Sequence, residues 1–584
     1  MLKLFRYLKP YWKQVLAIFL AISFQVWSAL QLPAIMAQIV NGIMADSLDF
    51  VWDSGLKMIG FALLASAGSV LANFLSARVG TAVARDLRND IFRQVLSFSI
   101  TDINSFSTAS LITRTMNDVS QVHQAVMMCL SMALRAPMTA VFAVVQAIAT
   151  APDMTWIIAL AVSVIFVLVV TILSIVMPKF KIMQKLIDKI TLLTRENLTG
   201  LRVIRAFNNE ALERKKFDHT NNAVAKLAIT VNTIMSLQNP LISLVFNGAV
   251  LLCIWAGVSL MTTDFSYLGN MMAFMQYAIQ VIMSFLFLTM LFIILPRANV
   301  SAGRINEILD RKPKIRWKEH TLGKPSLAPS VEFDHVGFAY PDAEEDVLEN
   351  VSFVANAGET TAFIGSTGSG KSTLINLVPR FYEATKGKIK INGLEIQDYA
   401  EDDLMRRIGY VPQKGVLFAG TVKSNIKFGA PEISDEKVYA AARVAQAEEF
   451  IEKLDKKYDS HIAQGGSNVS GGQKQRLSIA RAIAKDPDIY IFDDSFSALD
   501  MKTDVKLRKA LKPITKNAVT LIVAQRIGTI KDADQIIVLD RGKVVGKGTH
   551  LELLKNCGVY REIAKSQFSE AEFKSELKKG GVNA

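Results

Sequence analysis

The 584-residue sequence predicts an α-helical domain with six transmembrane spans, followed by an α/β domain. Three observations lead to this fold class. Hydrophobic residues make up 51% of the chain and charged residues 20%, which is too apolar for an ordinary soluble protein and too charged for a pure membrane bundle. The first half contains long stretches without charge, as membrane spans require. The second half alternates short β-branched runs with helical patterns, which is typical of a largely parallel sheet.

Six stretches without charged residues locate the spans, because a helix needs about 20 mostly apolar residues to cross a bilayer. These stretches are residues 14–45, 58–77, 136–152, 154–178, 227–263 and 265–296. Only Asp153 separates the third stretch from the fourth, which predicts a short hairpin there. Lysine and arginine gather before the first stretch and after the second, fourth and sixth, whereas the other connections carry mostly acids. The positive-inside rule therefore places both termini in the cytoplasm, with the chain in the cell membrane.

Two of the cytoplasmic connections are unusually long. Residues 78–122 and 179–226 each comprise about 45 residues, and both are polar and helix-patterned rather than rich in glycine or proline. This pattern predicts helices that continue out of the membrane. A separate small cytoplasmic subdomain is the alternative.

Composition excludes several other classes of protein. The cysteines Cys129, Cys253 and Cys557 are odd in number and far apart, so they indicate neither a disulfide framework nor a zinc site. The net charge of +13 fits the basic cytoplasmic loops of a membrane protein. The sequence contains no basic run with interleaved aromatic residues, so a nucleic-acid partner is not expected. The expected surroundings of the first half are the lipid bilayer.

The sequence divides into three parts. We predict a membrane domain over residues 1–310, a basic, proline-containing linker over 311–330 and the α/β domain over 331–584. Within the α/β domain, the predicted strands are residues 361–364, 408–411, 488–492, 519–523 and 535–538.

A phosphate-binding motif lies between a predicted strand and a predicted helix. Residues 365–372 read Gly-Ser-Thr-Gly-Ser-Gly-Lys-Ser and match the G-x-x-x-x-G-K-[ST] pattern completely. The backbone N–H groups of such a loop surround phosphate oxygens, and the helix N-terminus adds a favourable dipole potential. Lys371 is expected to neutralise β and γ phosphate oxygens, and Ser372 to bind Mg²⁺. The predicted nucleotide-binding residues here are Gly365, Ser366, Thr367, Gly368, Ser369, Gly370, Lys371, Ser372 and Thr373.

A carboxylate at the end of another strand supports this site. The apolar run 488–493 ends at Asp493, about 120 residues after the phosphate-binding loop. P-loop enzymes need such a carboxylate to hold Mg²⁺. Asp493 is therefore the second predicted metal residue.

The stretch Val469-Ser-Gly-Gly-Gln-Lys-Gln-Arg476 resembles the signature sequence of ABC transporters. Together with the phosphate-binding loop and six spans, it identifies the chain as similar to an ABC exporter half-transporter. The resemblance covers essentially the whole chain. It implies an ATPase-coupled translocase that uses ATP and Mg²⁺, with an ABC-type P-loop domain after the membrane domain.

The resemblance also implies roles for individual residues. Tyr340 lies where the aromatic residue that stacks on adenine is expected, and Gln413 matches the glutamine that approaches Mg²⁺ and the attacking water. Asp500 lies in the loop through which two nucleotide sites sense each other. The residues that would bind the γ-phosphate of an ATP held by another subunit are Ser470, Gly471, Gly472 and Gln473. Residues 104–111 and 206–212 match the coupling helices that contact nucleotide domains.

Two positions depart from the family pattern. Asp494 stands where the family has the glutamate that activates water, and Gln525 stands in place of the switch histidine. Aspartate is shorter by one methylene, and a neutral amide cannot carry a proton near pH 7. These changes predict a weakly hydrolytic own site, with Asp494, Gln525 and Gln413 as its catalytic residues. The intact signature then predicts a homologous but non-identical half-transporter as partner, as in heterodimeric bacterial multidrug exporters.

The expected cargo is amphiphilic, because no span carries a cluster of charges. Methionine and aromatic residues, which suit adaptable apolar sites, occur in the sixth span from Met271 to Met290 and in the first span around Phe24 and Trp27. We therefore predict export of amphiphilic drugs or lipids. Export of a peptide or an endogenous lipid, and a nucleotide-gated regulatory module with little hydrolysis, are the alternatives.

Overall fold

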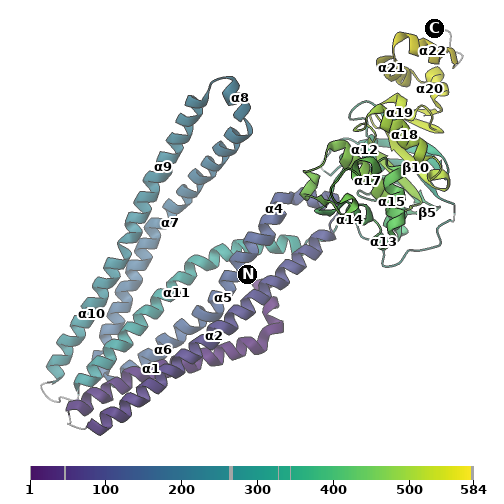
Figure 1. Ribbon diagram of the computed structural model, residues 1–584. Helices are drawn as coiled ribbons and strands as arrows, with labels where there is room; N and C mark the ends of the chain where they lie inside the picture. The colour runs from purple at the N-terminus through teal and green to yellow at the C-terminus, as the bar shows by residue number, and fades with distance from the viewer. Residues whose placement is uncertain (1, 45–47, 262–266, 327, 342, 580–584) are drawn as a thin grey trace. The chain divides into compact units, whose positions relative to one another are not determined.

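The computed structural model describes residues 2–44, 48–261, 267–326, 328–341 and 343–579. The chain divides into two compact units (Figure 1). The first unit comprises Met1–Leu96 and Thr108–Arg311, and the second comprises Ser97–Ser107 and Lys312–Ala584. The second unit therefore includes a short segment between the second and third spans, and its longer part begins within the predicted linker.

Six helical segments of the described chain are long and apolar enough to cross a membrane, which confirms the six predicted spans. The fourth span follows the third after a single turn at Pro152–Met154, where the hairpin was predicted. The helices of the first unit are η1 (Leu2–Tyr11), α1 (Trp12–Met44), α2 (Leu48–Leu96), α4 (Thr108–Thr113), η2 (Arg114–Asp118), α5 (Val119–Met128), η3 (Cys129–Ala133), α6 (Leu134–Thr150), η4 (Pro152–Met154), α7 (Thr155–Thr199), α8 (Leu201–Ala206), α9 (Glu210–Ser236), α10 (Gln238–Met261) and α11 (Tyr267–Leu309).

The long connections predicted to be cytoplasmic are continuations of the spanning helices. α2 has 49 residues, which at 1.5 Å per residue is about 74 Å, far more than the roughly 30 Å of a bilayer core. α7 has 45 residues, and α9 returns beside it after the short helix α8 (Figure 1). The buried side chains of Ile172, Val176 and Val231 join these two helices. The alternative of a separate cytoplasmic subdomain is therefore wrong.

The second unit is built on two sheets. The larger has the strand order β12-β11-β3-β10-β9-β6, with every neighbouring pair parallel except the edge pair β11–β12. Its strands are β3 (Thr360–Gly365), β6 (Ile408–Val411), β9 (Ile489–Asp493), β10 (Val519–Val523), β11 (Gln535–Asp540) and β12 (Lys543–Gly548). All five predicted strands are confirmed, and β9 and β10 are buried along their whole length, as their continuous apolar runs indicate.

The smaller sheet is antiparallel and was not predicted. Its order is β2-β1-β4-β5, from β1 (Ser330–Phe338), β2 (Leu348–Asn356), β4 (Lys386–Ile391) and β5 (Leu394–Glu395). Two further short strands, β7 (Gly420–Thr421) and β8 (His461–Ile462), pair with each other. The helices are α3 (Ile100–Phe106), α12 (Lys371–Leu377), α13 (Glu401–Arg406), α14 (Val422–Lys427), α15 (Asp435–Val444), α16 (Glu448–Ile451), α17 (Gly471–Ala484), α18 (Met501–Leu511), α19 (Ile527–Ile530), α20 (His550–Asn556), α21 (Gly558–Gln567) and α22 (Glu570–Lys579).

The predicted linker is held against the second unit. The backbone N–H of Lys314 donates to Asp102 Oδ2 at 3.0 Å, and Asp102, which is fully buried, also forms the capping box of α3 with Ser99. Further along, Arg380 Nη2 donates to the carbonyl of Arg316 at 3.3 Å, and its guanidinium lies 4.6 Å from the Trp317 ring centre. The linker residues from Lys314 to Trp317 are therefore held within this unit.

The two stretches expected to contain coupling helices fall at helix boundaries. Residues 104–111 include the end of α3, a break at Ser107 with φ of +58°, and the start of α4. Residues 206–212 include the end of α8 and the start of α9. The short helices themselves, α3 and α8, begin four and five residues earlier than these stretches.

Candidate nucleotide site

The carboxyl ends of four neighbouring parallel strands form the candidate site. In the order β3-β10-β9-β6, the residues that follow these strands are the phosphate-binding loop, Gln525, Asp494 and Gln413. Open α/β sheets bind their ligands at this edge. The strand order therefore places side chains that are far apart in sequence next to one another, with Asp494 between the two glutamines.

The phosphate-binding loop joins β3 to α12 through backbone that requires glycine. Gly370, the residue before α12, has φ of +95°, which glycine adopts without steric cost. A Cβ on Gly365 would lie 2.1 Å from the carbonyl oxygen of Leu539 on the neighbouring strand β11. Gly368 also has positive φ, and the side chain of Ser369, between Gly368 and Gly370, is buried. The loop thus presents its backbone N–H groups at the first turn of a helix, an arrangement that binds phosphates.

Lys371 lies across this loop. Its Nζ donates to the carbonyls of Gly365 at 2.8 Å and Ser366 at 2.7 Å, and to Ser369 Oγ at 3.3 Å. Burial lowers the pKa of Lys371, and the carboxylates of Asp494 and Asp493 oppose that effect. The ammonium group is therefore held over the loop by weak acceptors that phosphate oxygens can replace.

Ser372 and Asp493 form a pair suited to a divalent cation. Ser372 Oγ donates to Asp493 Oδ1 at 3.0 Å, and Asp493 ends the fully buried strand β9. Burial raises the pKa of Asp493, while the hydrogen bond from Ser372 opposes it. A hydroxyl and a carboxylate at this spacing are the oxygen ligands that P-loop proteins use for Mg²⁺, so the residues fit this ion.

Asp494 is the point where two amide side chains meet. Its Oδ2 accepts hydrogen bonds from Gln525 Nε2 at 2.8 Å and from Gln413 Nε2 at 3.3 Å. Its backbone has φ of +46°, a left-handed conformation that aspartate tolerates better than most residues. Burial raises the pKa of the carboxyl, and hydrogen bonds from Gln413, Ser497 and Gln525 are among the effects that oppose it. The structure thus brings together Gln413, Asp494 and Gln525, the three residues that the sequence analysis predicts to be catalytic.

Tyr340 lies beside the helix that follows the phosphate-binding loop. Its hydroxyl is 3.0 Å from Thr373 Oγ1, and its ring makes edge contacts with Tyr382 and Phe338 at centre distances of 5.3 and 4.9 Å. These contacts fix the ring close to α12 (residues 371–377). Its stacking on adenine stays a prediction.

The signature segment caps a different helix. Ser470 precedes α17, accepting the backbone N–H of Gln473 at 3.3 Å while its own N–H donates to Gln473 Oε1 at 2.9 Å. A Cβ on Gly472 would lie 3.4 Å from the carbonyl oxygen of Ala498, so the signature adjoins the loop that contains Asp500. Asp500 caps α18 by accepting the N–H of Thr503.

These residues stand apart from the phosphate-binding loop. In the part of the chain that the structure describes, no hydrogen bond joins Ser470, Gly471, Gly472 or Gln473 to residues 365–373. The exposed helix N-terminus at Ser470 is therefore available to a nucleotide held elsewhere.

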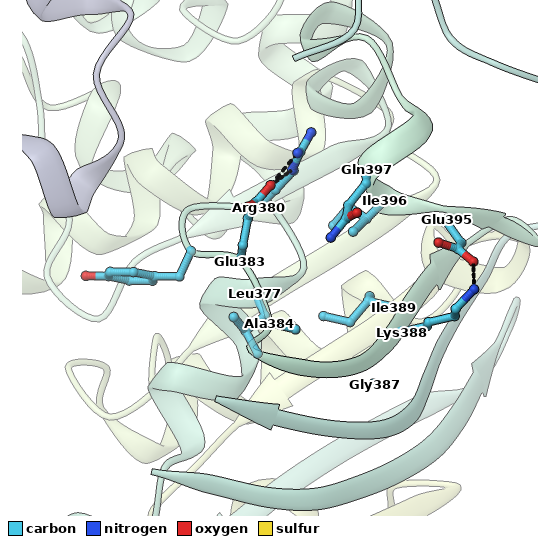
Figure 2. Close-up of a pocket in the computed structure, with 11 residues that line it drawn as sticks. Leu377, Arg380, Glu383, Ala384, Gly387, Lys388, Ile389, Glu395, Ile396 and Gln397 are labelled. Atoms are coloured by element: carbon cyan, nitrogen blue, oxygen red, sulfur yellow. Dashed lines mark hydrogen bonds and ion pairs between the residues drawn. The ribbon is translucent and has the colours of Figure 1, made fainter. Parts of the chain in front are cut away.

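A pocket of about 140 Å³ lies beyond the end of α12 (Figure 2). Leu377, Ala384 and Ile389 provide apolar walls, and Arg380 turns toward Glu383, to which its Nε donates at 3.2 Å. Lys388 pairs with Glu395 at the other side. Because its charged groups are paired with each other, this pocket is distinct in character from the phosphate-binding loop.

Sequence reasoning missed two glutamines that contact the loops of Gln413 and Gln525. Gln475 of α17 bonds to the backbone on both sides of Gln413, and Gln567 of α21 bonds to the backbone on both sides of Arg526. Gln475 lies inside the quoted signature stretch, and its position one turn into the helix was the only available signal. Nothing in the sequence around Gln567 marks it.

Comparison with known proteins identifies the family of the chain. The family described as ABC transporter transmembrane region matches residues 15–285, and the family described as ABC transporter matches residues 348–497. An uncharacterised ABC transporter ATP-binding protein of Mycobacterium tuberculosis is 36% identical over 567 residues, covering 96% of this chain and 97% of that protein. An ATP-dependent lipid A-core flippase of Hahella chejuensis is 31% identical over 576 residues, covering 98% and 97%.

A solved structure supports the same assignment of fold. The structure of a bacterial Atm1-family ABC exporter with ATP bound superimposes with a TM-score of 0.80 at 24% identity, covering 96% of this chain and 99% of that one. The chain therefore belongs to the ABC transporters and carries one transmembrane domain followed by one ATPase domain.

Proposed function

We propose that this chain is one half of an ATP-driven exporter that moves amphiphilic drugs or lipids out across the cytoplasmic membrane, and that its own ATP site hydrolyses slowly. The arrangement of membrane domain and ATPase domain supports the transport part. Relatives named lipid A-core flippases, at 31% identity, favour a cargo of lipid character. The basic cytoplasmic connections favour both termini in the cytoplasm.

The first and sixth spans support an apolar cargo. Trp27, Met283 and Phe287 expose between 42% and 51% of their surface, whereas Met271 and Tyr277 are buried. The buried residues hold the helices together, since Tyr277 Oη donates to the carbonyl of Leu30 at 3.1 Å. The exposed residues are thus the better candidates for contact with cargo or lipid.

ATP would bind at the phosphate-binding loop. Lys371 would replace its contacts with loop carbonyls by contacts with phosphate oxygens. Ser372 and Asp493 would hold Mg²⁺, which neutralises charge on the transferred phosphoryl group when bound. Tyr340, beside Thr373, would position the base.

The observation that carries the slow-site proposal is the double hydrogen bond to Asp494. The amides of Gln413 and Gln525 both donate to Asp494 Oδ2, so they fix where the short carboxylate ends, and a neutral amide stands where the family has histidine. Aspartate also ends one methylene short of the usual glutamate, and Gln525 cannot accept a proton at neutral pH. The carboxylate is therefore poorly placed to activate water, and the residue at position 525 cannot take up a proton.

The signature, by contrast, has the form needed to complete a site on another chain. Ser470 caps α17 with both reciprocal hydrogen bonds, and Gly471 and Gly472 leave the helix end open. We therefore propose a homologous, non-identical half-transporter as partner, whose ATP this signature contacts.

Purified full-length chain in lipid nanodiscs tests the proposal. We expect it to bind MgATP and to turn it over far below 1 per second, a rate at the low end of ordinary enzymes. Co-expression with a homologous chain that carries glutamate and histidine at the corresponding positions should restore turnover and support transport of fluorescent lipids and dyes. Brisk turnover by the chain alone, abolished by Asp494→Asn, would contradict a degenerate site and indicate a homodimer.

A further inference from the structure

The loop that contains Gln413 is attached to the signature helix by one buried side chain. Gln475 is 1% exposed; its Nε2 donates to the carbonyl of Pro412 at 3.0 Å, and its Oε1 accepts the N–H of Gly415 at 2.9 Å. These two bonds enclose Gln413 and Lys414. A Cβ on Gly415 would lie 2.9 Å from the Lys474 backbone, so this loop packs directly on α17.

The loop that contains Gln525 is attached in the same manner to a C-terminal helix. Gln567, the last residue of α21, donates from Nε2 to the carbonyl of Gln525 at 2.7 Å and accepts the N–H of Ile527 at Oε1 at 2.8 Å. α21 is itself anchored by Tyr560, which is fully buried and lies 2.7 Å from His550 Nδ1 of α20. Helices α17 and α21 are separate elements of the second unit (Figure 1).

An amide side chain is suited to this task because it carries one donor and one acceptor. It can therefore bind a carbonyl and an N–H of one loop at the same time and fix the residues between them or beside them. Both glutamines use this geometry, and the side chains of the two loops they hold, Gln413 and Gln525, meet at a single atom, Asp494 Oδ2.

We propose that Gln475 and Gln567 are positioning residues for the ATPase reaction: Gln475 holds the Gln413 loop, and Gln567 holds the Gln525 loop, so that both amides meet at Asp494. The proposal rests on the proposed function in taking Asp494 as part of the chain's own ATP site. It adds that two helices far apart in the sequence, α17 and α21, determine the geometry at this one carboxylate.

Single-turnover hydrolysis by the full-length chain in nanodiscs tests this role. Gln475→Met and Gln567→Met preserve side-chain length and remove both hydrogen bonds. We expect the rate constant to fall about 10- to 100-fold for Gln475→Met, since a misplacement of about 1 Å has effects of this size, and about 3- to 10-fold for the more exposed Gln567→Met. Affinity for a fluorescent ATP analogue should stay within about twofold, because neither residue contacts the phosphate-binding loop.

Matched controls come from the same helices. Ser478→Ala removes a buried hydroxyl of α17, and Ser566→Ala removes an exposed hydroxyl of α21 that bonds only within its helix; both should leave hydrolysis unchanged. Gln475→Glu keeps the acceptor for Gly415 N–H and should retain more activity than Gln475→Met. Hydrogen exchange should rise at the Gly415 and Ile527 amides in the respective methionine variants.

The outcomes separate the two proposals. Unchanged rate constants in folded variants, or losses of rate and of nucleotide affinity in equal proportion, would overturn the positioning role. Rapid hydrolysis by the unmodified chain would contradict the slow site, yet the ratio of variant to unmodified rate would still decide the roles of Gln475 and Gln567. If Gln475→Met does not fold, Gln475→Glu and the surface variant Gln567→Met give the same decision.

Discussion

Replacing Asp494 by glutamate gives the sharpest test of the slow site. The substitution extends the side chain by one carbon–carbon bond, about 1.5 Å, and moves the carboxylate beyond the position where Gln525 and Gln413 bind it at 2.8 and 3.3 Å. Misplacement of a catalytic group by about 1 Å costs about 10²-fold in rate. That factor corresponds to about 2.7 kcal/mol, so restoring the length should raise hydrolysis by roughly 10- to 100-fold.

The same substitution should destabilise the domain. Asp494 is 6% exposed and has φ of +46°. Glutamate lacks the short side chain that makes a left-handed backbone tolerable for aspartate, a cost of about 1 kcal/mol, and the extra buried methylene costs about 1–3 kcal/mol. At roughly 2–4 °C per kcal/mol for a domain of this size, we expect the unfolding temperature to fall by about 4–16 °C. Higher activity should therefore accompany lower stability.

Phosphate release by the full-length chain in nanodiscs at saturating MgATP measures the effect. Asp494→Glu should be faster than the unmodified chain and Asp494→Asn no faster, and adding Gln525→His to Asp494→Glu should increase the rate further. Thermal unfolding of the same samples reports the stability. A folded Asp494→Glu variant with an unchanged or lower rate would refute the view that side-chain length limits this site.

Three other substitutions examine the remaining parts of the molecule. Lys371→Ala should weaken ATP binding to this chain at least tenfold, measured with a fluorescent analogue, while hydrolysis by the complex with its partner largely persists; complete loss of that hydrolysis would indicate two equivalent sites. Gly472→Asp should reduce hydrolysis by the complex more than Asp494→Asn does, because a charge at the open end of α17 repels the partner's γ-phosphate; an equal or smaller loss would reverse the assignment of the competent site. Arg380→Ala should lower the stability of the ATPase domain by about 1–3 kcal/mol in chemical unfolding, since it removes a buried guanidinium that holds Trp317; no change would show that the linker contributes nothing.

The sequence was sufficient to predict the elements whose patterns are local. The spans are visible as charge-free stretches, and β9 and β10 as continuous apolar runs, because strands buried on both faces leave no polar positions. The antiparallel sheet was not predicted because its strands carry polar residues between their buried positions. In β4, Lys386, Lys388 and Lys390 alternate with buried Ile389 and Ile391, and so many lysines in six residues resemble a loop rather than a strand.

The candidate site could be named residue by residue but not assembled. Gln413, Asp494 and Gln525 lie far apart along the chain, and their meeting depends on the strand order β6-β9-β10, which no local pattern specifies. Gln475 and Gln567 were invisible because both act through backbone groups of other loops. Gln475 lies within the signature stretch and Gln567 in no motif, but in both cases the contact with another loop depends on tertiary structure.

The hydrogen bond between Asp102 and the Lys314 backbone has a consequence for biosynthesis. The two residues are 212 positions apart, and ribosomes add about 5–20 residues per second, so Asp102 is made roughly 10–40 s before its partner exists. During that interval most of the membrane helices are synthesised, while the buried carboxylate of α3 still faces water. The segment 97–107 can therefore reach its final packing only after the last span has been made, which makes the junction at Lys314 a late event in the maturation of this transporter.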